Sequence, residues 1–220
     1  MKKTITVMAL LAGAVSGFSQ GQIAMFDYGS SFAIQVFAPS TVASPISVTY
    51  GGYTVLEEQG NTAGNDNPGS ATYTGAPLGS GYDVELLGGP QGTALGSLMP
   101  VSGSLITSWL TGASAGYWNA PTQVASIPGT TTTATVAIAA WAATGPLGAA
   151  TTLAAAQADG YAWGISAPAT TATLGFGSVT PPFLPAGLTS FSIASVPEPS
   201  TVALGVIGAS SFLMRLRRKK

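Results

Sequence analysis

Short apolar runs, interrupted by Gly, Pro, Ser, Thr and Asn, make up most of this chain, and such a pattern favours strands and turns over helices. Within residues 53–57 and 135–139, β-branched and aromatic residues recur at every second position, which is the period of a strand with one buried face. Strands are predicted over residues 23–28, 32–37, 46–50, 53–57, 82–87, 105–110, 133–142, 162–166, 173–176 and 190–194.

One short helix is predicted over residues 152–158, where the sequence LAAAQA is rich in the strongest helix former and Gly160 offers a stop. Many short strands with so little helix favour an all-β fold, an antiparallel β-sandwich over residues 20–195. A parallel β-solenoid is the alternative, but the sequence has no fixed internal period to support it. Loops are predicted over residues 59–69, 113–121 and 180–187.

The first 19 residues have the pattern of a secretory signal peptide. Lys2 and Lys3 precede an apolar stretch that is too short to span a bilayer stably, and the small residues Gly17 and Ser19 follow it. We therefore expect the secretion machinery to export the chain, and we expect cleavage after Ser19 to leave Gln20 as the first residue of the mature domain.

Residues 196–220 have a second ordered pattern. Val196, Pro197, Glu198 and Pro199 form an extended breaker, because each proline fixes its own φ and disfavours helix at the residue before it. The uncharged run 200–214 follows, and at about 1.5 Å per residue it makes a helix shorter than a hydrocarbon core of about 30 Å. Snorkelling of the first basic residue would complete a transmembrane helix. The basic end consists of Arg215, Arg217, Arg218, Lys219 and Lys220.

This order of Pro-Glu-Pro, short apolar helix and basic end resembles the PEP-CTERM sorting signal of Gram-negative bacteria. The resemblance covers only residues 196–220, and it implies recognition and cleavage near the motif by exosortase, a membrane protease. It further implies a transient stay in the inner membrane and a destination in the cell envelope, at the cell surface or in the extracellular matrix, in association with exopolysaccharide. An ordinary C-terminal membrane anchor is the alternative reading of the same residues.

The segment between the two ends carries acidic charge only. No Lys or Arg occurs between Thr4 and Met214, so no salt bridge can form inside the domain, and phosphate backbones would be repelled. This excludes nucleic acid as a partner. Mutual repulsion predicts raised pKa values for the carboxyl groups of the domain. These acids are Asp27, Glu57, Glu58, Asp66, Asp83, Glu85 and Asp159.

The chain contains neither cysteine nor histidine. Their absence excludes disulfides, thiolate and imidazole metal ligands, and the Ser-His-Asp arrangement. We expect no enzymatic activity, no cofactor and no bound metal. Asn65, Asp66 and Asn67 do offer oxygen ligands for calcium, but a site with one carboxylate would bind weakly and a solvated turn is the preferred interpretation.

Two pairs of residues suggest contact with a carbohydrate. Asp83 and Glu85 are two apart on a predicted strand and so share a face, which suits either the two carboxylates of a glycosidase or a plain solvated surface. Tyr117 and Trp118 lie in a predicted loop and are candidates for stacking on sugars, whereas Trp141 lies in an apolar strand and is predicted to be core. The sequence thus favours a non-enzymatic structural or adhesive protein, with a carbohydrate-binding module or weak glycoside hydrolase as the alternative.

Overall fold

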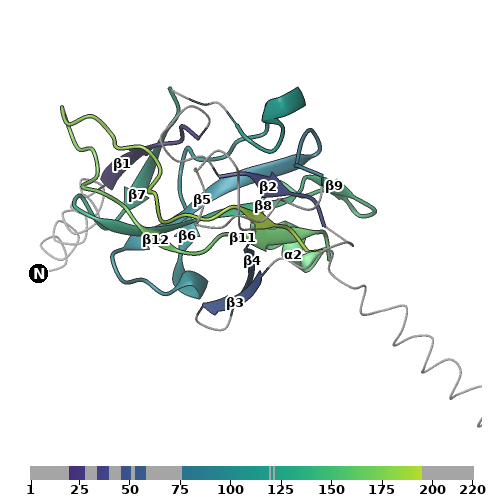
Figure 1. The fold of residues 1–220 in the computed structure, drawn as a ribbon. Coiled ribbons are helices and arrows are strands. Elements are labelled where there is room, and N and C mark those ends of the chain that lie inside the picture. The colour runs from purple at the N-terminus through teal and green to yellow at the C-terminus, as the bar shows by residue number, and fades with distance from the viewer. Residues whose placement is uncertain are drawn as a thin grey trace, which may run out of the picture.

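The structure, a computed structural model, describes residues 20–27, 34–39, 46–50, 53–57, 76–118, 120 and 122–194 (Figure 1). In chain order its elements are β1 (Gln20–Ala24), β2 (Val36–Phe37), β3 (Ile46–Tyr50), β4 (Tyr53–Glu57), β5 (Tyr82–Pro90), η1 (Leu95–Ser97), β6 (Met99–Pro100), η2 (Gly112–Ser114), β7 (Val124–Pro128), β8 (Ala134–Ala142), β9 (Thr144–Gly145), β10 (Gly148–Ala149), α2 (Leu153–Ala158), β11 (Trp163–Ile165), β12 (Ala169–Thr170) and β13 (Phe191–Ser192).

The strand-rich character predicted from the sequence is confirmed, and the paired strands run antiparallel except for β13 beside β2. β3 and β4 have the predicted bounds, and β5 and β8 begin within one residue of theirs. The strand predicted over 105–110 is wrong. There only Ile106 pairs, exchanging two hydrogen bonds with Val84 at N···O distances of 2.8 and 2.9 Å, and the chain then bends so that the Leu110 N–H reaches Tyr117.

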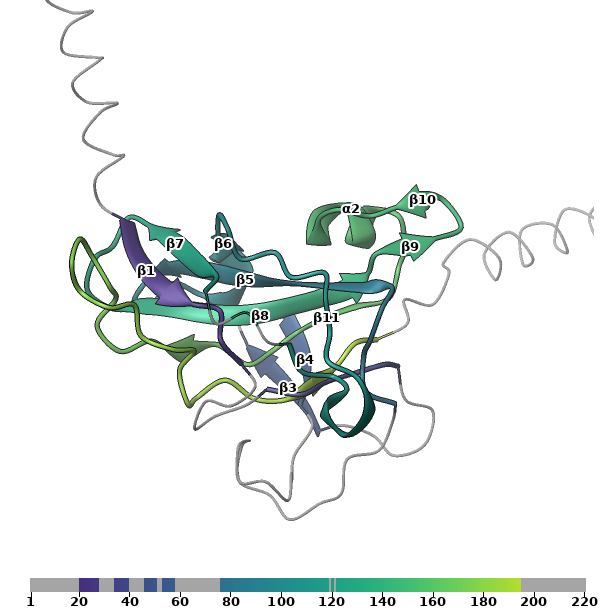
Figure 2. The same ribbon diagram turned by 90° about the horizontal axis from the view of Figure 1, so that it is seen from above.

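The longest strands, β5 and β8, form the centre of the fold. They pair over nine positions, from Tyr82 opposite Ala142 to Pro90 opposite Ala134, in a sheet ordered β11, β8, β5, β6, with β12 also beside β8. Figure 2 shows β1 and β7 at one end of this pair and α2 with the β9–β10 hairpin at the other. The described chain is thus arranged around two adjacent strands.

β8 is buried from Ala134 to Trp141, so the prediction of a strand with only one buried face is wrong here. Val136 and Ile138 face one hydrophobic cluster, and Ala137 and Ala139 face a second. The strand is therefore an almost continuous apolar run, because both of its faces are covered.

Different elements cover the two faces. Figure 1 shows β1, β7 and β2 on one side of the β5–β8 pair and α2, β3 and β4 on the other. The sheet ordered β2, β13, β4, β3 contributes to both sides, since Val36 of β2 lies in the first cluster and Val55 of β4 in the second. A bridge between Trp163 and Ala194 joins this sheet to β11. The second sheet therefore wraps around the β11 edge of the first.

The helix predicted over 152–158 is confirmed as α2. The Thr152 hydroxyl accepts the Ala155 N–H at 3.1 Å and caps its first turn, and Gly160, at a φ of 71°, ends it in the left-handed region that favours glycine. Leu153 and Ala156 are buried in the second cluster, so the helix closes that face of β8.

Candidate functional site

The sorting motif Val196, Pro197, Glu198 and Pro199, the basic end Arg215 to Lys220 and the predicted signal peptide all lie outside the described residues. The structure does fix the point from which the tail departs. The Ala194 N–H donates to the Trp163 carbonyl at 2.9 Å, and the Trp163 N–H donates to the Ala194 carbonyl at 3.2 Å. The sorting motif begins two residues after this pinned edge in the sequence.

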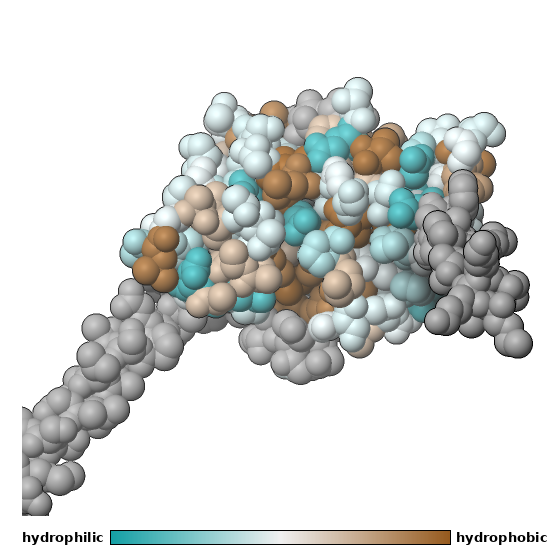
Figure 3. Space-filling view, turned by 180° about the vertical axis from the view of Figure 1, so that it is seen from behind, coloured by the Kyte–Doolittle hydropathy of each residue, from teal (hydrophilic) through white to brown (hydrophobic). Residues whose placement is uncertain are grey.

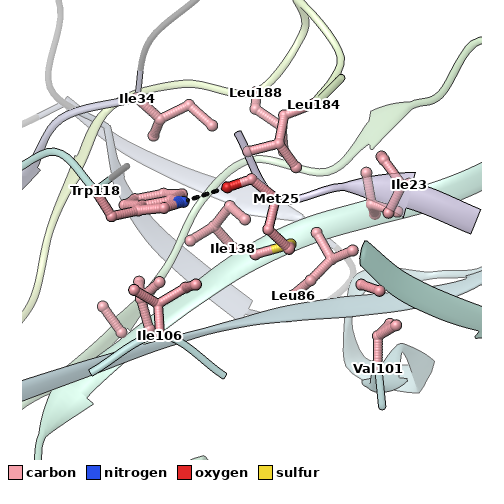
Figure 4. Packing of buried hydrophobic residues seen from close by; sticks show 14 of the residues in the cluster. Ile23, Met25, Ile34, Leu86, Val101, Ile106, Trp118, Ile138, Leu184 and Leu188 are labelled. Carbon is pink, nitrogen blue, oxygen red and sulfur yellow. Dashed lines mark hydrogen bonds between the residues drawn. The ribbon is translucent and has the colours of Figure 1, made fainter. Parts of the chain in front are cut away.

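The prediction that Trp118 is a surface aromatic is wrong. Its side chain is 0% exposed, and its indole N–H donates to the Met25 carbonyl at 2.9 Å (Figure 4). The ring also meets Trp109 edge to face, with centroids 6.0 Å apart. Tyr117 is buried as well, and its hydroxyl lies 3.3 Å from the Gln35 side-chain oxygen. Neither ring can stack on a sugar in this fold.

Trp141 is core, as predicted. It is 0% exposed, and its indole N–H donates to the Ala150 carbonyl at 2.9 Å. Trp118 was misassigned because the polar residues around it suggested an exposed loop, whereas residues 116–118 are all buried. Two fully buried tryptophans, each with one backbone acceptor, anchor opposite faces of the same sheet.

Asp83 and Glu85 share one face of β5, as predicted. Their partners on β8 are Trp141 and Ala139, which belong to the second hydrophobic cluster. The face is not the solvated one that the sequence allowed, because Asp83 is only 9% exposed and Glu85 is half-buried. Desolvation by burial raises the pKa of both carboxyl groups above the ordinary range.

The chemistry open to these two acids is narrow. One Glu85 oxygen is buried with no hydrogen-bond partner among the described residues. Within the same ranges no three acidic, histidine or cysteine side chains gather as a metal site, and the calcium candidates Asn65, Asp66 and Asn67 fall outside them. A carboxyl group with a raised pKa can act as a proton donor, and this is the catalytic property that burial gives the pair.

Exposed aromatic side chains occur instead in the segment 175–183, beside β1. Phe176 is 49% exposed, and Val179 and Phe183 are 56% exposed. We call the segment 175–183, which carries these three side chains, the Phe loop. On the face that Figure 3 shows, hydrophobic side chains lie scattered between polar ones. This surface was not predicted from the sequence, because Phe176 was placed in a predicted strand and only Tyr and Trp residues were considered as candidates for stacking on sugars.

The Phe loop is held in place by backbone contacts. Gln22 and Gly175 exchange two hydrogen bonds of 2.7 and 2.9 Å, and the Ala24 N–H donates to the Pro182 carbonyl at 2.8 Å. A Cβ on Gly175 would lie 2.7 Å from the Pro181 backbone, so this close approach requires glycine. The ring of Phe183 also rests on that of Phe26, with centroids 5.4 Å apart. The loop therefore displays its apolar side chains from a fixed backbone.

Comparison with known protein families, with curated proteins and with solved structures finds no match to this chain. Among the described residues no helix combines the length and apolar character needed to cross a membrane.

Proposed function

We propose that this chain is an exported, non-enzymatic protein of the cell envelope or extracellular matrix, where it has a structural or adhesive role associated with exopolysaccharide. Secretion machinery exports it, its C-terminal helix holds it in the inner membrane for a time, and exosortase processes it at the PEP-CTERM signal. The observation that carries the proposal is the order of Pro197, Glu198, Pro199, apolar run and basic end in a chain that also begins like a signal peptide.

The described domain supports the proposal. All Lys and Arg side chains of the chain lie at its two ends, as expected if the segment between them is exported. β8 is buried on both faces, so this segment has a hydrophobic core of its own. We propose further that the layers on either side of β5 and β8 make up a β-sandwich whose second sheet wraps around the β11 edge.

Replacement of Pro197, Glu198 and Pro199 by alanine tests the sorting proposal. The apolar helix should then extend through the break, so export should continue while processing stops. The readout is the mass of the cell-associated product in a host that has exosortase. Ser210→Ala with Ser211→Ala, in the same tail, is the matched control and should be processed normally. Equal loss of the basic end from the wild type and the triple variant would contradict the sorting role.

Binding of a neutral polysaccharide is the second candidate function, and the observation that favours it is the Phe loop. Apolar ring faces pack on sugar rings without need for charge, and Phe176 and Phe183 are exposed on a fixed backbone. A glycan array should show binding by the wild type that is lost in Phe176→Ala with Phe183→Ala. Leu147→Ala, which alters a side chain 73% exposed at the β9–β10 turn, is the control. Turnover of a bound glycan that Glu85→Gln abolishes would indicate the glycoside hydrolase instead.

A further inference from the structure

Gln20 occupies a distinct position at the start of β1. Its side chain is exposed, and it pairs opposite Pro128 at the end of β7. From the next residue onward the strand is fixed, because the Gly21 N–H donates to the Thr130 carbonyl at 2.6 Å and the Gln22 N–H to Gly175 at 2.7 Å. β1 therefore begins with a glutamine whose side chain lies in solvent, and the backbone that follows it is held by hydrogen bonds.

We propose that Gln20 is a modification site, at which the new amino terminus closes onto its own side chain to form pyroglutamate. This inference rests on the proposed export, because only cleavage after Ser19 frees the Gln20 amine. The amine nitrogen attacks the side-chain amide carbon, a C–N bond forms, and the C–Nε2 bond breaks. One amine proton leaves with that nitrogen as ammonia, and the lactam nitrogen keeps the other. No oxidant, reductant or second substrate is consumed.

The chemistry suits the position. An α-amino group ordinarily titrates at about pH 8, so part of it is neutral and nucleophilic at neutral pH. The exposed side chain is free to turn back on its own amine, because the five-membered ring involves only atoms of Gln20 and disturbs no pairing from Gly21 onward. Gln22 cannot react in this way, since its nitrogen is already part of a peptide bond.

The consequence concerns the charge of the whole product. No Lys or Arg lies between Thr4 and Met214, so the Gln20 amine is the only cationic group that processing at both ends would leave. Ring closure removes it. The mature domain would then carry carboxylates and no positive charge.

The test uses the full chain, secreted by a Gram-negative host. The secreted protein is purified and incubated at neutral pH, alongside a synthetic peptide of residues 20–26, until the peptide has cyclised completely. It is then denatured and cut before Asp27, and the N-terminal fragment is weighed and treated with an amine-labelling reagent. We expect a fragment 20–26 that lacks one ammonia and takes no label.

Gln20→Ala is the matched control. It has no side-chain amide for the amine to attack, so its fragment should keep both its mass and its label. A wild-type fragment that begins at Gln20 and still takes the label after the peptide has cyclised overturns the inference and leaves export intact. A fragment that begins at any other residue overturns the expected cleavage, and the inference with it.

Discussion

Trp118 lies wholly within the first hydrophobic cluster, where its indole N–H reaches the Met25 carbonyl (Figure 4) and its ring meets that of Trp109 edge to face. Its burial rests on one hydrogen bond as much as on packing, because the indole N–H must find an acceptor where no water reaches it. The Met25 carbonyl supplies that acceptor from just beyond the end of β1. The side chain thus ties the segment after β1 to residues 116–118 on the same face of the sheet.

Two substitutions separate packing from hydrogen bonding at this site. Trp118→Ala removes the whole ring and should lower the free energy of unfolding by about 3–5 kcal/mol. Trp118→Phe keeps much of the volume but leaves the Met25 carbonyl without its donor, and its hydrogen-bond component should cost about 1–3 kcal/mol. Urea unfolding of the purified domain measures both. A domain whose stability is unchanged by Trp118→Ala would contradict full burial of the ring.

At the scale of the elements, hydroxyl groups complete the sheets where strands are interrupted. β11 and β12 both pair with β8, and Ser166 lies between them with its Oγ accepting the Ile138 N–H at 2.9 Å. Ser104 accepts the Leu86 N–H at 3.0 Å beside β5, and Thr171 accepts the Ala134 N–H at 3.0 Å beside β8. All three are buried. In a domain without cations, these short side chains satisfy the buried backbone donors.

Ser166→Ala tests this role. The change leaves the Ile138 N–H buried and unpaired, so the free energy of unfolding should fall by about 1–3 kcal/mol. Ser108→Ala, at an exposed serine, should change it by less than about 0.5 kcal/mol. Denaturant melts at one protein concentration compare the two variants. Equal stability of both would mean that Ile138 has another acceptor.

Sequence pattern predicts the elements that are long or regularly alternating and misses those that depend on distant partners. β3, β4, β5, β8 and α2 follow from alternation or helix propensity alone. β12 and the β9–β10 hairpin have two-residue strands, and β7 has the small residue Ala125 where a larger apolar one would have marked its buried face. The burial of Trp118 was not predictable from its neighbours either, because its acceptor at Met25 is 93 residues away in sequence.

At the scale of the whole molecule, burial of charge without opposite charge sets the response to pH. Desolvation raises the pKa of Asp83 and Glu85 in the folded state. The direction is the one predicted from the sequence, but the cause is burial and not mutual repulsion. The folded state then binds more protons than the unfolded state between the ordinary and the raised pKa values. Stability should therefore rise as pH falls through the raised values, and the gain is complete only below the ordinary pKa values of these groups, at about pH 3.

Thermal melts at pH 7 and at about pH 4.5, in low salt, measure this effect, and the melting temperature should be higher at the lower pH. Asp83→Asn with Glu85→Gln should flatten the difference, since neither replacement titrates. Asp159→Asn, at the exposed end of α2, is the control. A lower melting temperature at the acidic pH would contradict the raised pKa values of Asp83 and Glu85.

The pairing of Ala194 with Trp163 also decides how the domain would bear mechanical load. Tension on an anchored tail enters at Ala194, so the two hydrogen bonds to Trp163 take it first, followed by that from the Ile193 N–H to the Phe37 carbonyl. Bonds loaded one after another yield at lower force than bonds loaded together. A domain held by its tail would therefore release the β11 edge first, while β5 and β8 stay paired beneath it.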